Sequence, residues 1–282
     1  MSLHSQYITH PSGETTHYIA DCHADPWRPR ETILLQGGFA RHAAFFYQWV
    51  PALSRYYNVV RRDLRGHGLS SAPSISQKPE AYTLETILAE IVDTLDQLGV
   101  EKVHFFGEST SGILGEIFAA RYPQRVLSLT ICSSPTHLPK ATQDFLAMGQ
   151  SSWPEACRTL GSEGWARALS ERPGTMASND PAYRKWWLEQ ISISSAEGLG
   201  SYAEFLCTVD SRPILDQIRV PMLILAPTRS AATSVAAQKD LQKVIGESCQ
   251  LVEIDGPGHE IYSEAADKCI AAYMTFVSSI ER

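Results

Sequence analysis

The fold of this chain is decided by the stretch Phe105-Phe106-Gly107-Glu108-Ser109-Thr110-Ser111-Gly112. An apolar strand pattern runs here directly into a helix pattern, with Ser109 at the turn and small residues two positions before and after it. So tight a turn holds the serine in a strained backbone conformation that only small neighbours tolerate. We expect it to raise the Ser109 hydroxyl above the edge of a sheet and to direct the backbone N–H of Thr110 at the same point, beside the positive end of the helix dipole.

Alternating strand and helix patterns surround this turn. Short apolar runs predict buried strands at 32–36, 57–62, 102–106, 126–132, 220–226 and 250–254. Helical periodicity predicts helices at 43–54, 83–98, 112–122, 235–245 and 263–280. Weak alternation in the first twenty residues predicts a two-stranded ribbon. Continuous apolar strands that alternate with helices indicate an α/β protein with a mostly parallel, doubly wound sheet covered on both faces.

Residues 135–212 interrupt this alternation. They carry four of the six tryptophans and show mainly helical patterns without a core strand. We interpret them as a helical cap inserted between two strands of the sheet, so that residues 1–134 and 213–282 form the core. The alternative is a longer run of covering helices.

Length, composition and charge exclude several classes of protein. A chain of 282 residues, 44% hydrophobic and 20% charged, can bury the core of one or two domains. The net charge of −7 argues against nucleic-acid binding, and no apolar run approaches the roughly 20 residues that span a bilayer. With no secretory signal and six scattered cysteines, we expect a cytoplasmic monomer or homodimer with reduced thiols. Since phosphate loops, dinucleotide fingerprints and clustered metal ligands are missing, we expect a small-molecule substrate and neither cofactor nor metal.

Three further motifs lie in order along the chain. They are Gln36-Gly37-Gly38, Asp63-Leu64-Arg65-Gly66-His67-Gly68-Leu69-Ser70 and Gly256-Pro257-Gly258-His259. Together with the serine turn, they make the sequence resemble proteins of the α/β-hydrolase fold over nearly its whole length. The resemblance implies that fold, with Ser109 as nucleophile and a mainly structural role for the segment 63–70. One departure is Ser111, which stands where the family's second glycine is usual.

The resemblance also implies how Ser109 is activated. A hydroxyl is a poor nucleophile until a neighbouring base takes its proton. His259, the only histidine after His137, stands in the family's position for that base. The oxyanion hole would consist of the backbone N–H groups of Gly38 and Thr110. The family's histidine before the first glycine is Gln36 here, a change that leaves the backbone donor in place.

The acid of a Ser-His-acid triad is missing from both loops in which the family places it. In the loop after 220–226, Ser230 stands at the usual acid position; in the loop after 126–132, Ser134 or Ser133 does. We predict that a serine hydroxyl orients His259, with Ser230 and Ser134 as equal candidates. Two alternatives stay open: a catalytically weak protein, or a carboxylate from Asp210, Asp255 or Glu260.

Aromatic side chains of the predicted cap are expected to line an apolar pocket. The residues predicted to face substrate are Phe39, His42, His137, Trp153, Trp186 and Trp187. The sequence thus predicts a serine hydrolase, an esterase or lactonase, that cleaves a carboxylic ester or lactone of a moderately apolar small molecule. Two other functions stay open on the same fold: a C–C bond hydrolase or cofactor-free dioxygenase in which His259 is a base toward substrate, or a non-catalytic ligand-binding relative.

Overall fold

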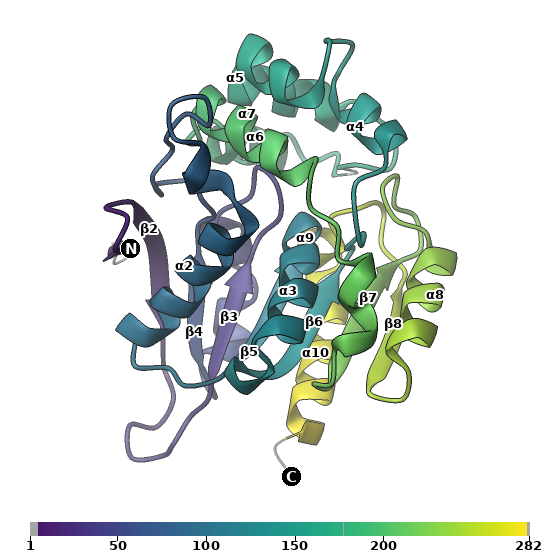
Figure 1. Cartoon of the computed structure of the whole chain (residues 1–282). Helices are drawn as coiled ribbons and strands as arrows, with labels where there is room; N and C mark the ends of the chain where they lie inside the picture. Colours follow the sequence, from purple (N-terminus) through teal and green to yellow (C-terminus); the bar gives the residue numbers. More distant parts are fainter. Residues whose placement is uncertain (1–4, 177, 281–282) are drawn as a thin grey trace.

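An eight-stranded sheet forms the centre of the computed structural model, which describes residues 5–176 and 178–280 (Figure 1). The strand order is β1-β2-β4-β3-β5-β6-β7-β8. β2 pairs antiparallel with β1 and β4, and the other neighbours are parallel. The strands are β1 Gln6–Thr9, β2 Thr15–Asp21, β3 Thr32–Gln36, β4 Asn58–Arg62, β5 Val103–Glu108, β6 Val126–Cys132, β7 Met222–Pro227 and β8 Cys249–Ile254.

Helices cover both faces of this sheet. Figure 1 shows α2, α3 and α8 on one face and α10 on the opposite face, so the predicted mostly parallel, doubly wound α/β fold is confirmed. The α-helices are α1 Val50–Leu53, α2 Leu84–Gln97, α3 Thr110–Arg121, α4 Lys140–Leu146, α5 Trp153–Ser170, α6 Pro181–Ile191, α7 Ala196–Leu206, α8 Val235–Ile245, α9 Ile261–Glu264 and α10 Ala266–Ile280. The 3₁₀ turns are η1 Ala43–Phe46, η2 Pro79–Tyr82, η3 Pro123–Arg125 and η4 Arg212–Gln217. No helix within the described residues is both long and apolar enough to cross a membrane.

Two predicted helices are broken in the structure. The helix predicted at 43–54 is instead the turn η1 followed by the single-turn α1. Pro51 has no backbone N–H, so one helix through 47–51 would lose a hydrogen bond. The helix predicted at 263–280 begins earlier, as α9, and is interrupted at Ala265 (φ −134°, ψ 38°) before α10.

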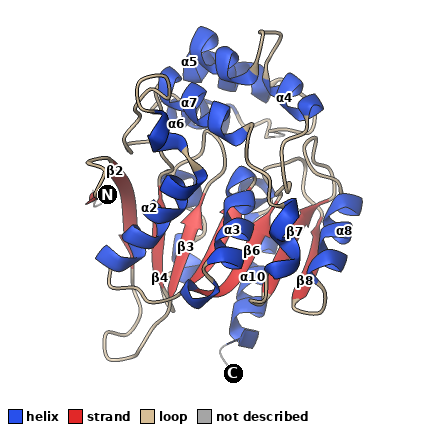
Figure 2. Ribbon diagram, viewed as in Figure 1, coloured by secondary structure: helices blue, strands red, loops and turns tan. Residues whose placement is uncertain are grey.

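Helices α4 to α7 lie together above the edge at which the parallel strands end (Figure 2). We call this group the helical layer. All four helices fall within residues 135–212. Trp153 and Trp165 are fully buried on α5 and fill the interior beneath the layer. The layer therefore covers the edge where the serine turn between β5 and α3 lies.

One backbone contact ties the helical layer to the core. A Cβ atom at Gly66 would lie 2.5 Å from the carbonyl oxygen of Gly198 on α7, and one at Gly198 would lie 2.6 Å from the Gly66 oxygen. Neither position has room for a side chain. The Gly68 N–H donates to Ser194 Oγ at 2.9 Å beside this contact, so α7 is held directly against the loop that follows β4.

Candidate active site

Ser109 lies at the turn between β5 and α3 with φ 50° and ψ −123°. A positive φ is uncommon for a residue other than glycine and persists only where the surroundings enforce it. The Ser109 N–H donates to the Cys132 carbonyl at 2.8 Å, and the Gly112 N–H donates to the Ser109 carbonyl at 2.9 Å. These bonds hold the turn and leave the Ser109 hydroxyl at the edge of the sheet.

The imidazole of His259 bridges two serine hydroxyls. Its Nε2 lies 3.0 Å from Ser109 Oγ, and its Nδ1 lies 2.8 Å from Ser230 Oγ. The His259 backbone is also held, because Ser133 Oγ donates to its carbonyl at 2.7 Å. Burial, and secondly the charge of Arg41, lower the pKa of His259 to about 4. The ring is therefore neutral near pH 7 and able to accept a proton.

The hydrogen bonds of Ser230 favour one tautomer of the His259 ring. Ser230 Oγ accepts the backbone N–H groups of Ala232 at 3.0 Å and Thr233 at 3.1 Å. A hydroxyl has two acceptor lone pairs and one hydrogen, so we assign the hydrogen of Ser230 to the bond with Nδ1 of His259. With that assignment the ring proton lies on Nε2, the opposite of the tautomer that a triad aspartate imposes.

The other carboxylates and hydroxyls considered as histidine partners lie elsewhere. Ser134 Oγ donates to the Pro135 carbonyl at 3.0 Å. Asp210 is ion-paired with Arg212 at 2.7 Å, and Asp255 is ion-paired with Arg229 at the surface, also at 2.7 Å. None of these bonds involves the ring of His259.

Glu260 belongs to a buried ion pair in the wall of the site. Its carboxylate pairs with Arg41 and accepts the Trp187 indole N–H at 3.0 Å. The Arg41 guanidinium also lies over the Trp187 ring, 4.6 Å from the ring centre. The charges of Arg41 and Glu260 therefore neutralise each other, and Glu260 is not free to orient His259.

The backbone N–H of Gly38, the predicted oxyanion donor, already has an acceptor. It donates to Oε2 of Glu108 at 2.7 Å. Burial raises the pKa of Glu108 to about 7. Glu108 was not among the predicted site residues, although a carboxylate at the end of a fully buried strand is a signal in itself.

The loop after β3 is tied to the serine turn by two further hydrogen bonds. The Phe39 N–H donates to Thr110 Oγ1 at 2.9 Å, and Ser111 Oγ donates to the Gly37 carbonyl at 2.6 Å. The hydroxyl of Ser111 thus gives a structural reason for the serine that replaces the usual glycine.

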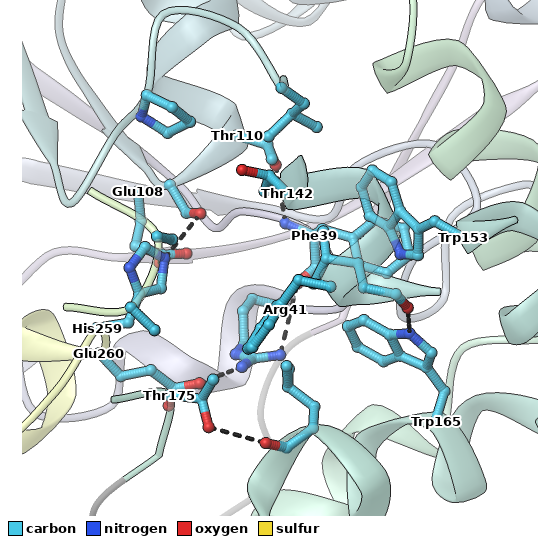
Figure 3. Close-up of a pocket in the computed structure, with 18 of the residues that line it drawn as sticks. Phe39, Arg41, Glu108, Thr110, Thr142, Trp153, Trp165, Thr175, His259 and Glu260 are labelled. Carbon is cyan, nitrogen blue, oxygen red and sulfur yellow. Dashed lines mark hydrogen bonds and ion pairs between the residues drawn. The ribbon is translucent and has the colours of Figure 1, made fainter. Parts of the chain in front are cut away.

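A cavity of about 300 Å³ lies against Ser109 and His259. In Figure 3, His259 and Glu260 lie on one side of it and Trp153 and Trp165 on the other. Phe39 packs edge-to-face on both tryptophans, with ring centres 4.5 and 5.1 Å apart. Apolar groups dominate the wall, which includes Phe39, Pro135, Leu138, Ala141, Phe145, Leu146, Trp153, Trp165, Leu169, Ala231 and Ala232.

Of the six side chains predicted to face substrate, Phe39 and Trp153 line this cavity and four do not. His42 Nε2 instead lies 3.1 Å from a backbone carbonyl of α6. His137 and Trp186 line separate surface pockets. Trp187 is fully buried behind Glu260. Within residues 5–176 and 178–280, no group of three His, Cys, Asp or Glu side chains is placed to hold a metal ion.

Known proteins resemble the chain in sequence and in structure. 3-Oxoadipate enol-lactonase 1 of Acinetobacter baylyi is 27% identical over 237 residues, 82% of this chain and 83% of the relative. Epoxide hydrolase 4 of Mus musculus is 34% identical over 127 residues, 44% of this chain and 33% of the relative. The crystal structure of the enol-lactonase from Burkholderia xenovorans LB400 matches with a TM-score of 0.84 and 25% identity, covering 97% of this chain and 100% of that chain. The model of the α/β hydrolase fold family matches residues 31–266, and the chain therefore belongs to that family.

Proposed function

We propose that this chain is a serine hydrolase that cleaves a carboxylic ester or lactone of a moderately apolar small molecule. The observation that carries the proposal is the 3.0 Å contact between Ser109 Oγ, on its strained turn, and Nε2 of a neutral His259. A nucleophile within hydrogen-bond reach of a base, with that base oriented by a third group, is the arrangement that nucleophilic catalysis needs. Here the third group is Ser230.

The chemistry follows from these contacts. The ring proton of His259 first moves from Nε2 to Nδ1. Ser109 Oγ then attacks the carbonyl carbon, and Nε2 takes the hydroxyl proton and later gives it to the leaving group. The Thr110 N–H at the start of α3 stabilises the charge on the carbonyl oxygen. Water then releases the acid from Ser109. Because Ser230 favours the tautomer of His259 with its proton on Nε2, the base that activates Ser109 is weakened. The site therefore suits an activated acyl group whose leaving group departs easily.

The cavity and the relatives support this substrate class. A largely apolar wall of this size suits a small molecule of moderate apolarity. Two of the relatives carry the name enol-lactonase, and an enol is a better leaving group than an ordinary alcohol. We propose that the helical layer acts as the cap over this cavity, within the cap range 135–212 and between the core segments 1–134 and 213–282.

A second candidate is a reaction in which His259 acts as base toward the substrate itself, as in C–C bond hydrolysis or cofactor-free dioxygenation. The observation that favours it is the hydroxyl, rather than a carboxylate, at Nδ1. In that case Ser109 would only bind substrate. Ser109→Ala would then keep most of the turnover, whereas His259→Ala would abolish it.

The test of the favoured function is covalent labelling by a fluorophosphonate. We expect wild type to be labelled on Ser109 and to hydrolyse aryl esters and lactones, and Ser109→Ala to do neither while keeping the wild-type melting temperature. Equal labelling of wild type and Ser109→Ala would refute the assignment. Tight binding of a ligand without turnover on a broad ester and lactone panel would instead support a non-catalytic relative.

A further inference from the structure

A carboxyl group lies in the position that the oxyanion hole should leave open. The Glu108 side chain is almost fully buried, lines the cavity and accepts the Gly38 N–H with its Oε2. Its second oxygen, Oε1, lies 4.0 Å from Nε2 of His259, the nitrogen that faces Ser109. A carbonyl oxygen placed over Ser109 therefore meets Glu108 before it can reach the Gly38 N–H.

Gly38 and Glu108 fit each other sterically. A Cβ atom at position 38 would lie 2.7 Å from the Cβ of Ser109 and 2.8 Å from Oε2 of Glu108. The backbone carbonyl of Glu108 would also lie 2.8 Å away, and real Cβ atoms essentially never come within 3.0 Å of another heavy atom. A side chain at 38 would therefore push against the serine turn as well as against the carboxyl group.

The surroundings of Glu108 favour its neutral form. Burial raises its pKa to about 7, against the opposing effects of Arg41 and of the Gly38 N–H. Arg41 is already ion-paired with Glu260, whose negative charge raises the pKa of Glu108 further. The carboxyl group therefore keeps its proton below about pH 7.

Three other titratable groups face Glu108. Burial lowers the pKa of His259 to about 4, so between that value and 7 the carboxyl of Glu108 is protonated while the imidazole is neutral. Tyr262 on α9 and Cys132 at the end of β6 have pKa values that burial raises well above the usual ones. Those two groups stay neutral throughout the range in which Glu108 titrates.

We propose that the neutral carboxyl of Glu108 donates a hydrogen bond to the carbonyl oxygen of the substrate and so replaces the Gly38 N–H in the oxyanion hole. Since Oε2 accepts the Gly38 N–H, the hydrogen is carried by Oε1, the oxygen on the side of His259. A carboxylic acid kept neutral by an apolar site is a known kind of oxyanion donor. The inference rests on the proposed hydrolase function.

The proton of Glu108 is not consumed in this scheme. With the ring proton of His259 moved to Nδ1, Ser109 Oγ bonds to the carbonyl carbon, the Ser109 proton passes to Nε2, and the π electrons of the C=O bond move onto oxygen. That oxygen accepts hydrogen bonds from the Thr110 N–H and the Glu108 O–H. On collapse the C=O bond re-forms, and the leaving group departs with the proton from His259. An ionised Glu108 would oppose this step by like-charge repulsion.

The test is the pH dependence of kcat/KM between pH 5 and 9.5 with p-nitrophenyl butyrate. Above about pH 7 wild type should lose roughly tenfold per pH unit and level off about 10²–10³ lower, the usual cost of one oxyanion donor. Glu108→Gln can accept and donate with the same shape but does not titrate. We expect its profile to be flat from pH 6 to 9 and its rate at pH 9 to exceed that of wild type at least about tenfold.

Glu108→Met removes the hydrogen-bond donor at position 108 and keeps a side chain of similar volume. It should show no fall above pH 7 and should be about 10²–10³ slower than wild type at pH 6, with the melting temperature of each variant as the folding control. A wild-type kcat/KM that rises or stays level from pH 6 to 9, or a Gln variant that keeps the alkaline fall, would overturn the inference but leave the hydrolase function intact. A protein with neither turnover nor fluorophosphonate labelling would overturn both.

Discussion

Replacing Ser230 by aspartate tests whether the tautomer of His259 limits this site. Ser230 Oγ accepts two backbone N–H groups and lies 2.8 Å from Nδ1, a bond to which we assign its hydrogen. An aspartate has about four acceptor sites and no hydrogen, so it can keep both backbone bonds and accept Nδ1–H as well. Ser230→Asp should therefore move the ring proton to Nδ1 and free Nε2 to act as the base.

The size of the gain can be bounded. In the serine-protease template, changing the triad aspartate to asparagine costs about 10⁴ in kcat, or about 5.4 kcal/mol of barrier. That figure is the ceiling for Ser230→Asp. Because the ring of His259 is already held in place by Ser230, we expect a smaller gain in kcat/KM, about 10- to 10³-fold at pH 7. The new charge should also raise the pKa of His259 from about 4 and shift the acid limb of the profile upward.

The assay pairs kcat/KM on an aryl ester with ¹⁵N NMR of the His259 ring. Ser234→Asp is the matched control, because it adds the same charge nearby and keeps a side chain that can cap α8 without contacting His259. The reasoning is refuted if wild type already carries its ring proton on Nδ1, or if folded Ser230→Asp is no faster than the Ser234→Asp control.

Two further perturbations test the walls of the cavity. Arg41→Met leaves Glu260 buried without its partner, and in urea titrations it should lower the free energy of unfolding by about 3–5 kcal/mol. The double variant Arg41→Met, Glu260→Met should recover most of that loss. A single variant as stable as wild type would contradict the buried ion pair. Phe145→Ala on α4 removes a half-buried ring from the cavity wall. Relative to wild type, its kcat/KM on p-nitrophenyl esters should rise by up to about fourfold for each methylene added to the acyl chain. An unchanged chain-length preference would place the acyl group elsewhere.

The central strands could be predicted because they are buried on both faces and read as mainly apolar runs. β3 and β6 occupy the predicted residues 32–36 and 126–132. The break between η1 and α1 was not predicted, because apolar periodicity takes no account of the missing N–H of Pro51.

Site residues could be predicted where the backbone fixes the position of the functional group. They were harder to predict where the side chain can point in more than one direction. Motif order alone places Ser109 and His259 together, and loop position alone makes Ser230 a candidate partner. Glu108 was not predicted to be a site residue, because the sequence around it does not indicate that its carboxyl group turns toward Gly38. Trp186 and Trp187 were both predicted to face the pocket, and neither does: neighbours on a helix point about 100° apart, and these two point to the surface and into the packing behind Glu260.

The glycine contact between Gly66 and Gly198 has a consequence for the way in. Because α7 is fixed to the core at this point, the helical layer cannot hinge open there. The most exposed residues that line the cavity are Ala141 on α4 and Ala231 and Ala232 in the loop before α8. We therefore expect substrate to enter between α4 and the loop that holds Ser230, so that it passes the hydroxyl bonded to Nδ1 of His259 on its way to Ser109.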